Sequence, residues 1–153
     1  MSGAHASPAL CALVRERAPY HVACSSAPST WAALQEHARD YVDLLIVFDG
    51  GCDDTIYPDA KTNHAFRAWH DSIHLANGYS FSRADEIKVG LIHMQQARAA
   101  GLPQSDQDML IADTIGQVEY YYSRREYVKN QSLFVAAVLS RGLKAVIDSG
   151  EVY

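Results

Sequence analysis

The chain has 153 residues and a hydrophobic fraction of 48%, enough for one hydrophobic core and too little for two substantial ones. Eighteen acidic residues outnumber 13 lysines and arginines, for a formal net charge of −5, so no basic field exists to hold a nucleic-acid backbone. Three separated cysteines without a CxxC pair, and apolar runs far shorter than a membrane span, predict one domain over residues 1–153 that is cytoplasmic and binds neither nucleic acid nor membrane.

Proline dipeptides dominate the first segment of the chain and predict an irregular lead-in over residues 1–29. From Thr30, apolar residues recur at helical spacing as far as Leu45, which predicts a first amphipathic helix. The apolar run 44–48 is followed by a glycine turn and by Thr55-Ile-Tyr57, a pattern that predicts two short strands in a hairpin.

Capping signals mark the helices in the rest of the chain. Thr62 or Asn63 is suited to begin a helix that reaches Ala76, and Asn77-Gly78 is a typical stop. The pairs Ser82/Asp85 and Ser105/Asp108 resemble capping boxes and predict helices that run to Gly101 and to Tyr127. A further helix, Gln131 to Arg141, is apolar nearly all round and is expected in the core. The sequence thus predicts a mainly α fold of about four to five helices with a small β element near residues 44–57, with a pure helical bundle as the alternative.

Histidines gather in the middle of the chain, where four of the seven lie between His64 and His93. Within FRAWHDSIH, residues 66–74, His70 and His74 are four residues apart on the expected helix, so both imidazoles can reach a single ion. Asp71 can orient one ring, bind the ion or hold a bound water. Arg67 is suited to an anionic substrate or to pairing with a nearby carboxylate such as Asp71 or Asp59.

The next helix offers two candidates for a third ligand, Glu86 in its first turn and His93 two turns later. The connection from His74 to Ser82 is short enough to make the two helices antiparallel, and this arrangement favours Glu86. On the third long helix, Asp113 and Glu119 point away from the apolar stripe and are candidates to complete the coordination sphere or a hydrogen-bond network. With His64, Arg67 and His93, these two residues form the set expected to support the ligands or to contact substrate.

The residues His70-Asp71-Ser72-Ile73-His74, followed by Glu86, resemble the HExxH motif and downstream glutamate of gluzincin-type metallopeptidases. The resemblance covers roughly 17 residues. It implies that His70, His74 and Glu86 bind zinc and that Asp71 is the general base. This sequence has Asp71 where the motif has glutamate, which shortens the side chain by one methylene.

Two other families share part of this pattern. His37, His70-Asp71 and Asp113 resemble the H…HD…D arrangement of HD-type phosphohydrolases. Asp71-x-x-His74, with Glu86 and Glu119 as bridges, resembles ferritin-like di-iron proteins, although the second Glu-x-x-His of that family is missing.

The leading hypothesis is a small metal-dependent hydrolase of peptidase-like type, with Asp71 as catalytic residue, His70, His74 and Glu86 as metal ligands, and a peptide or small molecule as substrate. Zinc is the first candidate for the divalent ion, and manganese or iron are alternatives. An HD-type phosphohydrolase is the second hypothesis. The opposing class is a non-enzymatic acidic interaction protein that binds a protein partner, or a second copy of itself, through its helices and tyrosines, with the histidines as a structural cluster.

Overall fold

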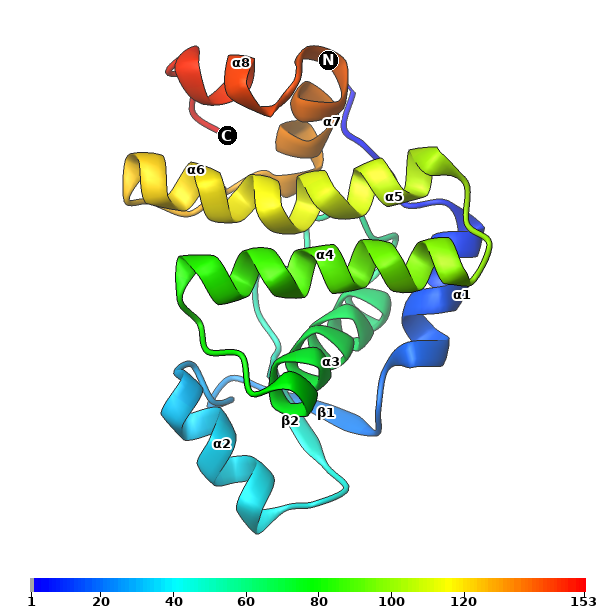
Figure 1. The fold of residues 1–153 in the computed structure, drawn as a ribbon, viewed down its shortest axis with the longest axis vertical. Helices are drawn as coiled ribbons and strands as arrows, with labels where there is room; N and C mark the ends of the chain where they lie inside the picture. The colour runs from blue at the N-terminus through cyan, green and yellow to red at the C-terminus, as the bar shows by residue number, and fades with distance from the viewer. Residues whose placement is uncertain (1) are drawn as a thin grey trace.

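Helices dominate residues 2–153, the part of the chain that this computed structural model describes (Figure 1). The elements in chain order are α1 (Pro8–Arg17), β1 (His21–Cys24), α2 (Trp31–Asp40), β2 (Leu45–Phe48), α3 (Ala60–Asn77), α4 (Arg83–Ala99), α5 (Gln104–Ile111), the π-helical turn η1 (Ala112–Gly116), α6 (Gln117–Arg124), α7 (Gln131–Arg141) and α8 (Leu143–Asp148). The mainly α fold class with a small β element is confirmed. The described residues contain more helices than the four to five expected, because α1 and α8 were not predicted.

The predicted irregular lead-in is wrong, since it contains α1 and β1. Pro8 stands at the start of α1, where a missing N–H costs nothing, and the Ser7 hydroxyl accepts a hydrogen bond from the Leu10 amide at 3.0 Å. Leu10 and Val14 are fully buried, and α1 packs against α3. The proline therefore begins a core helix.

The small sheet is a parallel pair, so the predicted hairpin is also wrong. β1 pairs with β2 in the register His21↔Leu45 to Cys24↔Phe48, and α2 makes the crossover that parallel strands require. Residues 55–57 form no strand. Their loop is held by a hydrogen bond from the Ala6 amide to the Ile56 carbonyl at 2.8 Å, and it buries Ile56 and Tyr57 in the core.

The predicted first helix was too long at its C-terminal end. α2 ends at Asp40, and Tyr41 and Val42 are exposed rather than packed on the helical face that the spacing suggested. Leu45 belongs to β2. The apolar spacing continued by chance across a helix end and a strand start, which periodicity alone does not separate.

The ends of α3 and α4 lie close to the positions predicted from the sequence. Asp59 rather than Thr62 or Asn63 caps α3, by accepting a hydrogen bond from the Thr62 amide at 2.7 Å. The helix ends at Gly78, whose φ of 66° is the left-handed conformation that glycine favours. The Ser82 hydroxyl caps α4 as predicted.

α5, η1 and α6 form one continuous helix beside α4 (Figure 1). The expected cap at Ser105 is wrong, because the helix begins after Pro103 and Ser105 lies inside the first turn. The π-helical turn at Ala112–Gly116 was not predicted. The boundaries expected for Gln131 to Arg141 match α7, which stops at Gly142 with a φ of 85°.

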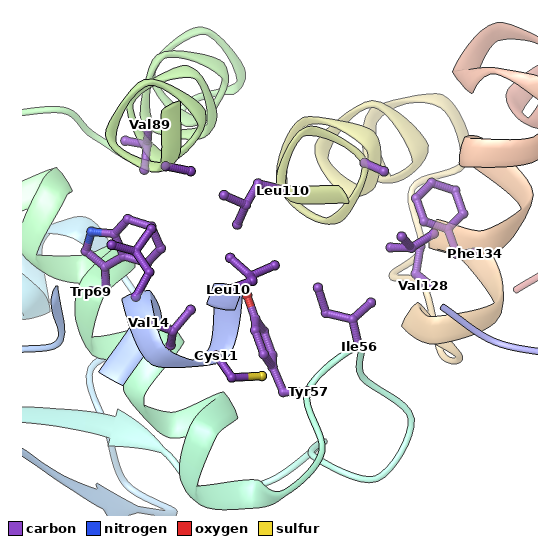
Figure 2. Packing of buried hydrophobic residues seen from close by; sticks show 14 of the residues in the cluster. Leu10, Cys11, Val14, Ile56, Tyr57, Trp69, Val89, Leu110, Val128 and Phe134 are labelled. Atoms are coloured by element: carbon purple, nitrogen blue, oxygen red, sulfur yellow. The ribbon is translucent and has the colours of Figure 1, made fainter. Parts of the chain in front are cut away.

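The main core joins helices from both halves of the chain (Figure 2). Leu10 of α1, Trp69 of α3, Val89 of α4, Leu110 of α5 and Phe134 of α7 are essentially inaccessible to solvent and belong to one hydrophobic cluster. A smaller cluster connects α2 and β2 to Ala68 on another face of α3. α3 is thus held between the two clusters, which fixes the direction of its histidines. Within residues 2–153, no helix has the length and apolar character needed to cross a membrane.

Candidate metal centre

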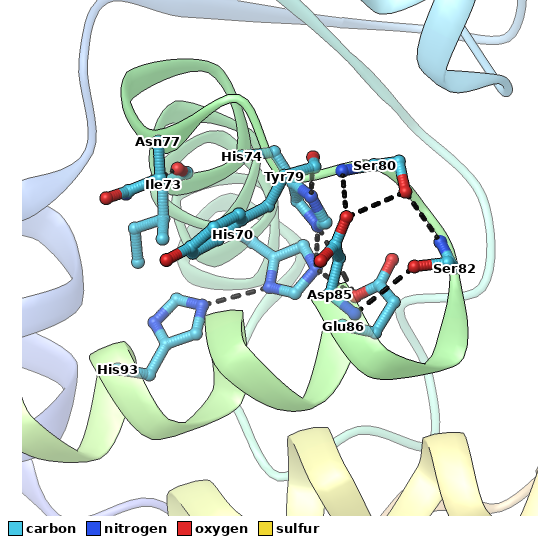
Figure 3. Close-up of polar contacts among 10 residues, drawn as sticks. All are labelled: His70, Ile73, His74, Asn77, Tyr79, Ser80, Ser82, Asp85, Glu86 and His93. Atoms are coloured by element: carbon cyan, nitrogen blue, oxygen red, sulfur yellow. Dashed lines mark hydrogen bonds and ion pairs between the residues drawn. The ribbon is translucent and has the colours of Figure 1, made fainter.

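Three side chains from α3 and α4 converge on one point, as Figure 3 shows. The distances are 3.2 Å between His70 Nε2 and His74 Nε2, 3.2 Å between His70 Nε2 and Glu86 Oε2, and 3.3 Å between His74 Nε2 and Glu86 Oε2. His70, His74 and Glu86, here called the triad, form the one group of at least three potential side-chain ligands found among the described residues. The sequence-based choice of these three residues therefore coincides with a group that can hold a metal ion.

The size of the triad matches the ligand spacing of a metal ion. An ion that binds nitrogen and oxygen at about 2.0–2.1 Å in a tetrahedral arrangement holds its ligands about 3.3 Å apart. All three sides of the triad have this length. An ion can therefore bind on one side of the three donor atoms without a movement of α3 against α4.

The other ring nitrogen of His74 is fixed by the connection between the helices. His74 Nδ1 lies 2.8 Å from the carbonyl oxygen of Tyr79, which can only accept, so Nδ1 carries the proton and donates it. In the neutral ring, Nε2 is then left with its lone pair directed at Glu86 and His70. The turn at Gly78 brings the Tyr79 carbonyl back over the last turn of α3, and His74 itself is fully buried. A hydrogen bond of this kind typically orients a metal-binding histidine.

His70 is held in the same way by another histidine. Its Nδ1 lies 2.9 Å from Nε2 of His93, and the planes of the two rings are nearly parallel, with an interplanar angle of 6°. His93 is fully buried between the rings of Phe66 and Trp69. Burial lowers the pKa of His93 well below its usual value, and the neighbouring histidines act in the same direction. A neutral His93 can accept the proton of His70 Nδ1, which leaves His70 Nε2 free for an ion. The alternative assignment of His93 as third ligand is not favoured.

The charges at the triad shift the pKa values of Glu86 and His74 in the direction opposite to the effect of burial. Burial raises the pKa of Glu86. Hydrogen bonds and charge from His70 and His74 lower it by a larger amount, so the resulting pKa is about 2. Burial likewise lowers the pKa of His74, but Glu86, the Tyr79 carbonyl and Asp71 together raise it, so the net shift is upward. Glu86 is thus an ionised carboxylate that attracts positive charge to this point. A divalent ion supplies that charge and allows both imidazoles to be neutral.

Two pockets meet at His70. The larger has a volume of about 390 Å³ and is lined by His70, Glu86 and Asp113, together with aromatic side chains (Phe66, Phe81, Tyr121, Tyr122, Tyr127) and amides (Asn63, Gln117, Gln131). The smaller has about 220 Å³ and is lined by His70 and Asp71, with Phe48 of β2 on its wall. An ion at the triad is therefore within reach of a ligand from the larger pocket, through His70 and Glu86.

Asp71 lies on the smaller-pocket side of His70. Its carboxyl makes no hydrogen bond within residues 2–153, and burial raises its pKa to about 6 in spite of the opposing charges of His70 and His74. A carboxylate with this pKa can gain or lose a proton near neutral pH. Its position beside the triad agrees with a role in proton transfer there.

Asp113 enters the larger pocket from the π-helical turn. It is 7% exposed, and its Oδ1 accepts a hydrogen bond from Gln117 Nε2 at 2.8 Å. Burial raises the pKa of Asp113 to about 7. π-helical turns inside α-helices occur often at functional sites. Asp113 is thus a second carboxyl with a shifted pKa beside His70, but it is not part of the triad.

The other predicted residues have separate partners. Arg67 donates to the carbonyl oxygens of Phe48 and Gly51, at 2.5 Å and 3.4 Å, rather than pairing with Asp71 or Asp59. Glu119 forms an ion pair with Arg83. His64 contacts Cys52. The set His37, His70, Asp71 and Asp113 of the phosphohydrolase hypothesis does not form a single group, because His37 Nε2 is 2.9 Å from the Leu44 carbonyl.

Sequence reasoning missed three parts of this centre: the Tyr79 carbonyl, the hydrogen bond between His93 and His70, and the position of Asp113 in a π-helical turn. The first had a signal in Asn77-Gly78, since a left-handed C-cap turns the chain back over the helix end. The other two depend on how α4 and η1 pack, for which one sequence gives no local signal. Comparison with protein-family models, with curated proteins and with solved structures gave no match, so the geometry of the centre is the basis for its interpretation.

Proposed function

We propose that the protein is a small zinc-dependent hydrolase whose metal is held by His70, His74 and Glu86. The observation that carries the proposal is the triangle of donor atoms with sides of 3.2, 3.2 and 3.3 Å, which has the dimensions of one face of a tetrahedral zinc site. Three protein ligands leave the fourth position open, as in catalytic rather than structural zinc sites. Two imidazoles and one carboxylate are a ligand set that suits zinc, with manganese and iron as alternatives.

Asp71 is the proposed general base. Zinc at such a site supplies the acidity that ionises a bound water near neutral pH. The Asp71 carboxyl lies beside His70, forms no hydrogen bond within the described range 2–153, and has a pKa raised to about 6. A base with this pKa is ionised at pH 7 and still basic enough to accept a proton.

The larger pocket supports a peptide-like substrate over a phosphate ester. Its walls carry aromatic rings and side-chain amides, which suit apolar side chains and amide groups. Arg67 is the cationic side chain on its lining, and two of its N–H groups are already directed at backbone carbonyls. Peptide-bond hydrolysis is therefore the proposed reaction class.

The first experiment is the metal content of protein purified without a histidine tag, measured by elemental analysis. We expect zinc in the parent and a loss of about one zinc per chain in each of His70→Ala, His74→Ala and Glu86→Gln. The matched control is His5→Ala, because His5 is exposed and distant in sequence from the triad. A parent that takes up no zinc, manganese or iron would sink the metal-enzyme proposal and favour the interaction-protein hypothesis.

The second experiment separates metal binding from catalysis. Asp71→Asn is expected to keep its zinc and to lose hydrolysis of a fluorogenic peptide library by a factor of about 10²–10⁴, the usual contribution of a general base. A library of phosphate esters is assayed in parallel. Hydrolysis of esters but not of peptides would overturn the peptidase-like assignment while leaving the zinc centre in place.

A further inference from the structure

A second group of potential metal donors lies at the start of α3, away from the triad. Cys52 Sγ is 3.4 Å from His64 Nε2. The carbonyl oxygen of Asp49 is 3.6 Å from the same sulfur and 3.4 Å from the same nitrogen, and the Gly50 carbonyl is also 3.6 Å from the sulfur. A thiol, an imidazole nitrogen and two carbonyl oxygens therefore converge on one small region.

The Cys52 thiol has more carbonyl acceptors around it than it has protons to donate. A carbonyl oxygen only accepts hydrogen bonds, and a thiol has one proton to give. The sulfur faces two carbonyl acceptors, those of Asp49 and Gly50, and also His64 Nε2, which accepts or donates according to the tautomer of the ring. A cation can interact with all of these lone pairs at once, whereas the single proton serves one of them at a time.

The distances also fit a thiophilic ion. Tetrahedral zinc, with bonds of about 2.3 Å to sulfur and about 2.0 Å to nitrogen, holds these two atoms about 3.5 Å apart. The triangle formed by Cys52 Sγ, His64 Nε2 and the Asp49 carbonyl has sides of 3.4, 3.4 and 3.6 Å. Its geometry is thus close to one face of such a site.

Asn63 and Arg67 hold this group in place from behind. The Asn63 amide is 4% exposed, and its Nδ2 donates to Cys52 Sγ at 3.3 Å. A donor to sulfur stabilises a thiolate, and hydrogen bonds to ligand atoms are a regular feature of metal sites. Arg67 binds the Phe48 and Gly51 carbonyls and so fixes the loop that carries Cys52. Side chains of α3 therefore hold Cys52 and its loop in position beside His64.

We propose that Cys52 and His64 form a second metal site, specific for a thiophilic ion of the zinc type, with the Asp49 carbonyl as third donor. Binding converts the Cys52 thiol to a thiolate and releases its proton to solvent. The site differs from the triad in having a sulfur ligand. It stands independently of the proposed hydrolase function, because none of its donor atoms belongs to the triad.

Cobalt(II) is the probe of choice, because it replaces zinc and because a thiolate ligand adds a charge-transfer band in the near ultraviolet that nitrogen and oxygen ligands do not give. The expected result is a charge-transfer band in the parent, which saturates at one cobalt per chain in His70→Ala, where the triad is disrupted. The band is lost in Cys52→Ser and His64→Gln.

Cys24→Ser is the matched control. Cys24 is also partly exposed, but its sulfur lies 3.2 Å from Ser26 Oγ with no histidine among its hydrogen-bond partners in residues 2–153. We expect this variant to keep the band. Zinc is expected to slow alkylation of Cys52 by iodoacetamide at least tenfold and to leave alkylation of Cys24 unchanged.

Several results would overturn the second site. These are a parent without a charge-transfer band at excess cobalt, a band that survives in Cys52→Ser, or equal alkylation of Cys52 with and without zinc. Circular dichroism of each variant establishes that it is folded, so that loss of the band is assigned to the ligand. Visible cobalt absorption that remains in Cys52→Ser, and that is lost when His70→Ala is added to that variant, reports on the triad alone and so separates the two sites.

Discussion

The two histidines of the triad differ in what holds their rings. A backbone carbonyl orients His74, whereas another side chain, His93, orients His70. A substitution cannot remove a backbone carbonyl, but it can replace the side chain of His93. His70 is therefore the ligand whose orientation a single substitution can test.

We expect His93→Gln to weaken zinc binding by a factor of about 10–100, the usual effect of losing the partner of a ligand histidine. The variant keeps all three ligand atoms, so the expected change is in affinity and not in stoichiometry. Competition with a chelator of known affinity measures it. An unchanged dissociation constant would show that His93 only fills space between Phe66 and Trp69.

Asp113 offers a test at the same scale through the pH dependence of stability. Its pKa is about 7 in the folded chain against 3.8 in the unfolded one. Between these values the folded state holds a proton that the unfolded state has lost, so this contribution falls as pH rises from about 4 to about 7 and is then constant. Over this range the free energy of unfolding of the parent is expected to fall by up to about 4 kcal/mol relative to that of Asp113→Asn, because each unit of pKa shift corresponds to about 1.4 kcal/mol.

Urea unfolding of both proteins with a chelator present, at several pH values, measures this difference. Asp71, whose pKa is also raised, contributes in the same direction in both proteins and cancels in the comparison. Parallel stability curves for the parent and Asp113→Asn from pH 4.5 to 8 would contradict the expected effect of burial on Asp113.

At the scale of the elements, predictions succeeded where the deciding signals were local. The ends of α7, the Gly78 stop of α3 and the Ser82 cap of α4 each depend on residues within one turn of the helix end. The same locality explains why the three residues chosen from the sequence, His70, His74 and Glu86, lie close together, since helical spacing and a short connection bring them to one point.

Predictions failed where the deciding contact was distant in sequence. The partner of β2 is β1, which lies beyond α2, and no neighbouring residue indicates it. α1 was missed because its prolines were interpreted as breaks, although Pro8 occupies the first helical position. The Cys52–His64 contact and the placement of Asp113 likewise require the folded chain.

Gly90 determines how closely α4 approaches the π-helical turn. A Cβ at this position would lie 2.6 Å from Ile115 Cγ1 and 2.8 Å from Thr114 Oγ1. Gly90→Ala is therefore expected to destabilise the protein by about 1–3 kcal/mol, although alanine is the better helix former. Chemical denaturation measures the loss.

Gln95→Ala is the control for this prediction, because Gln95 is exposed on the same helix. We expect it to change stability by less than about 0.5 kcal/mol. If Gly90→Ala were as stable as the parent or more stable, α4 and η1 would have room to separate, and the larger pocket would have a movable wall.

For the molecule as a whole, the proposed binding of a metal at the triad is expected to be coupled to unfolding. The donors come from two helices that pack on different parts of the core, so the unfolded chain has no preformed site. Zinc at 100 times its dissociation constant is expected to stabilise the fold by about 2.7 kcal/mol. A thermal melt with zinc and with a chelator measures the shift, and His70→Ala is expected to show a much smaller one. Equal melting temperatures for the zinc-bound and the chelated parent would contradict this coupling.

The α3–α4 hairpin has a consequence for the order of folding. His70 and Glu86 are 16 residues apart, and His93 is 23 residues from His70. The loop entropy for bringing these groups together is small, and contacts of short sequence separation form early. By contrast, the bond from the Ser132 hydroxyl to the Ala4 carbonyl spans 128 residues and joins the N-terminal segment to the start of α7. If the triad binds an ion as proposed, a nascent or partly folded chain can therefore bind it through this hairpin before the N-terminal segment contacts α7.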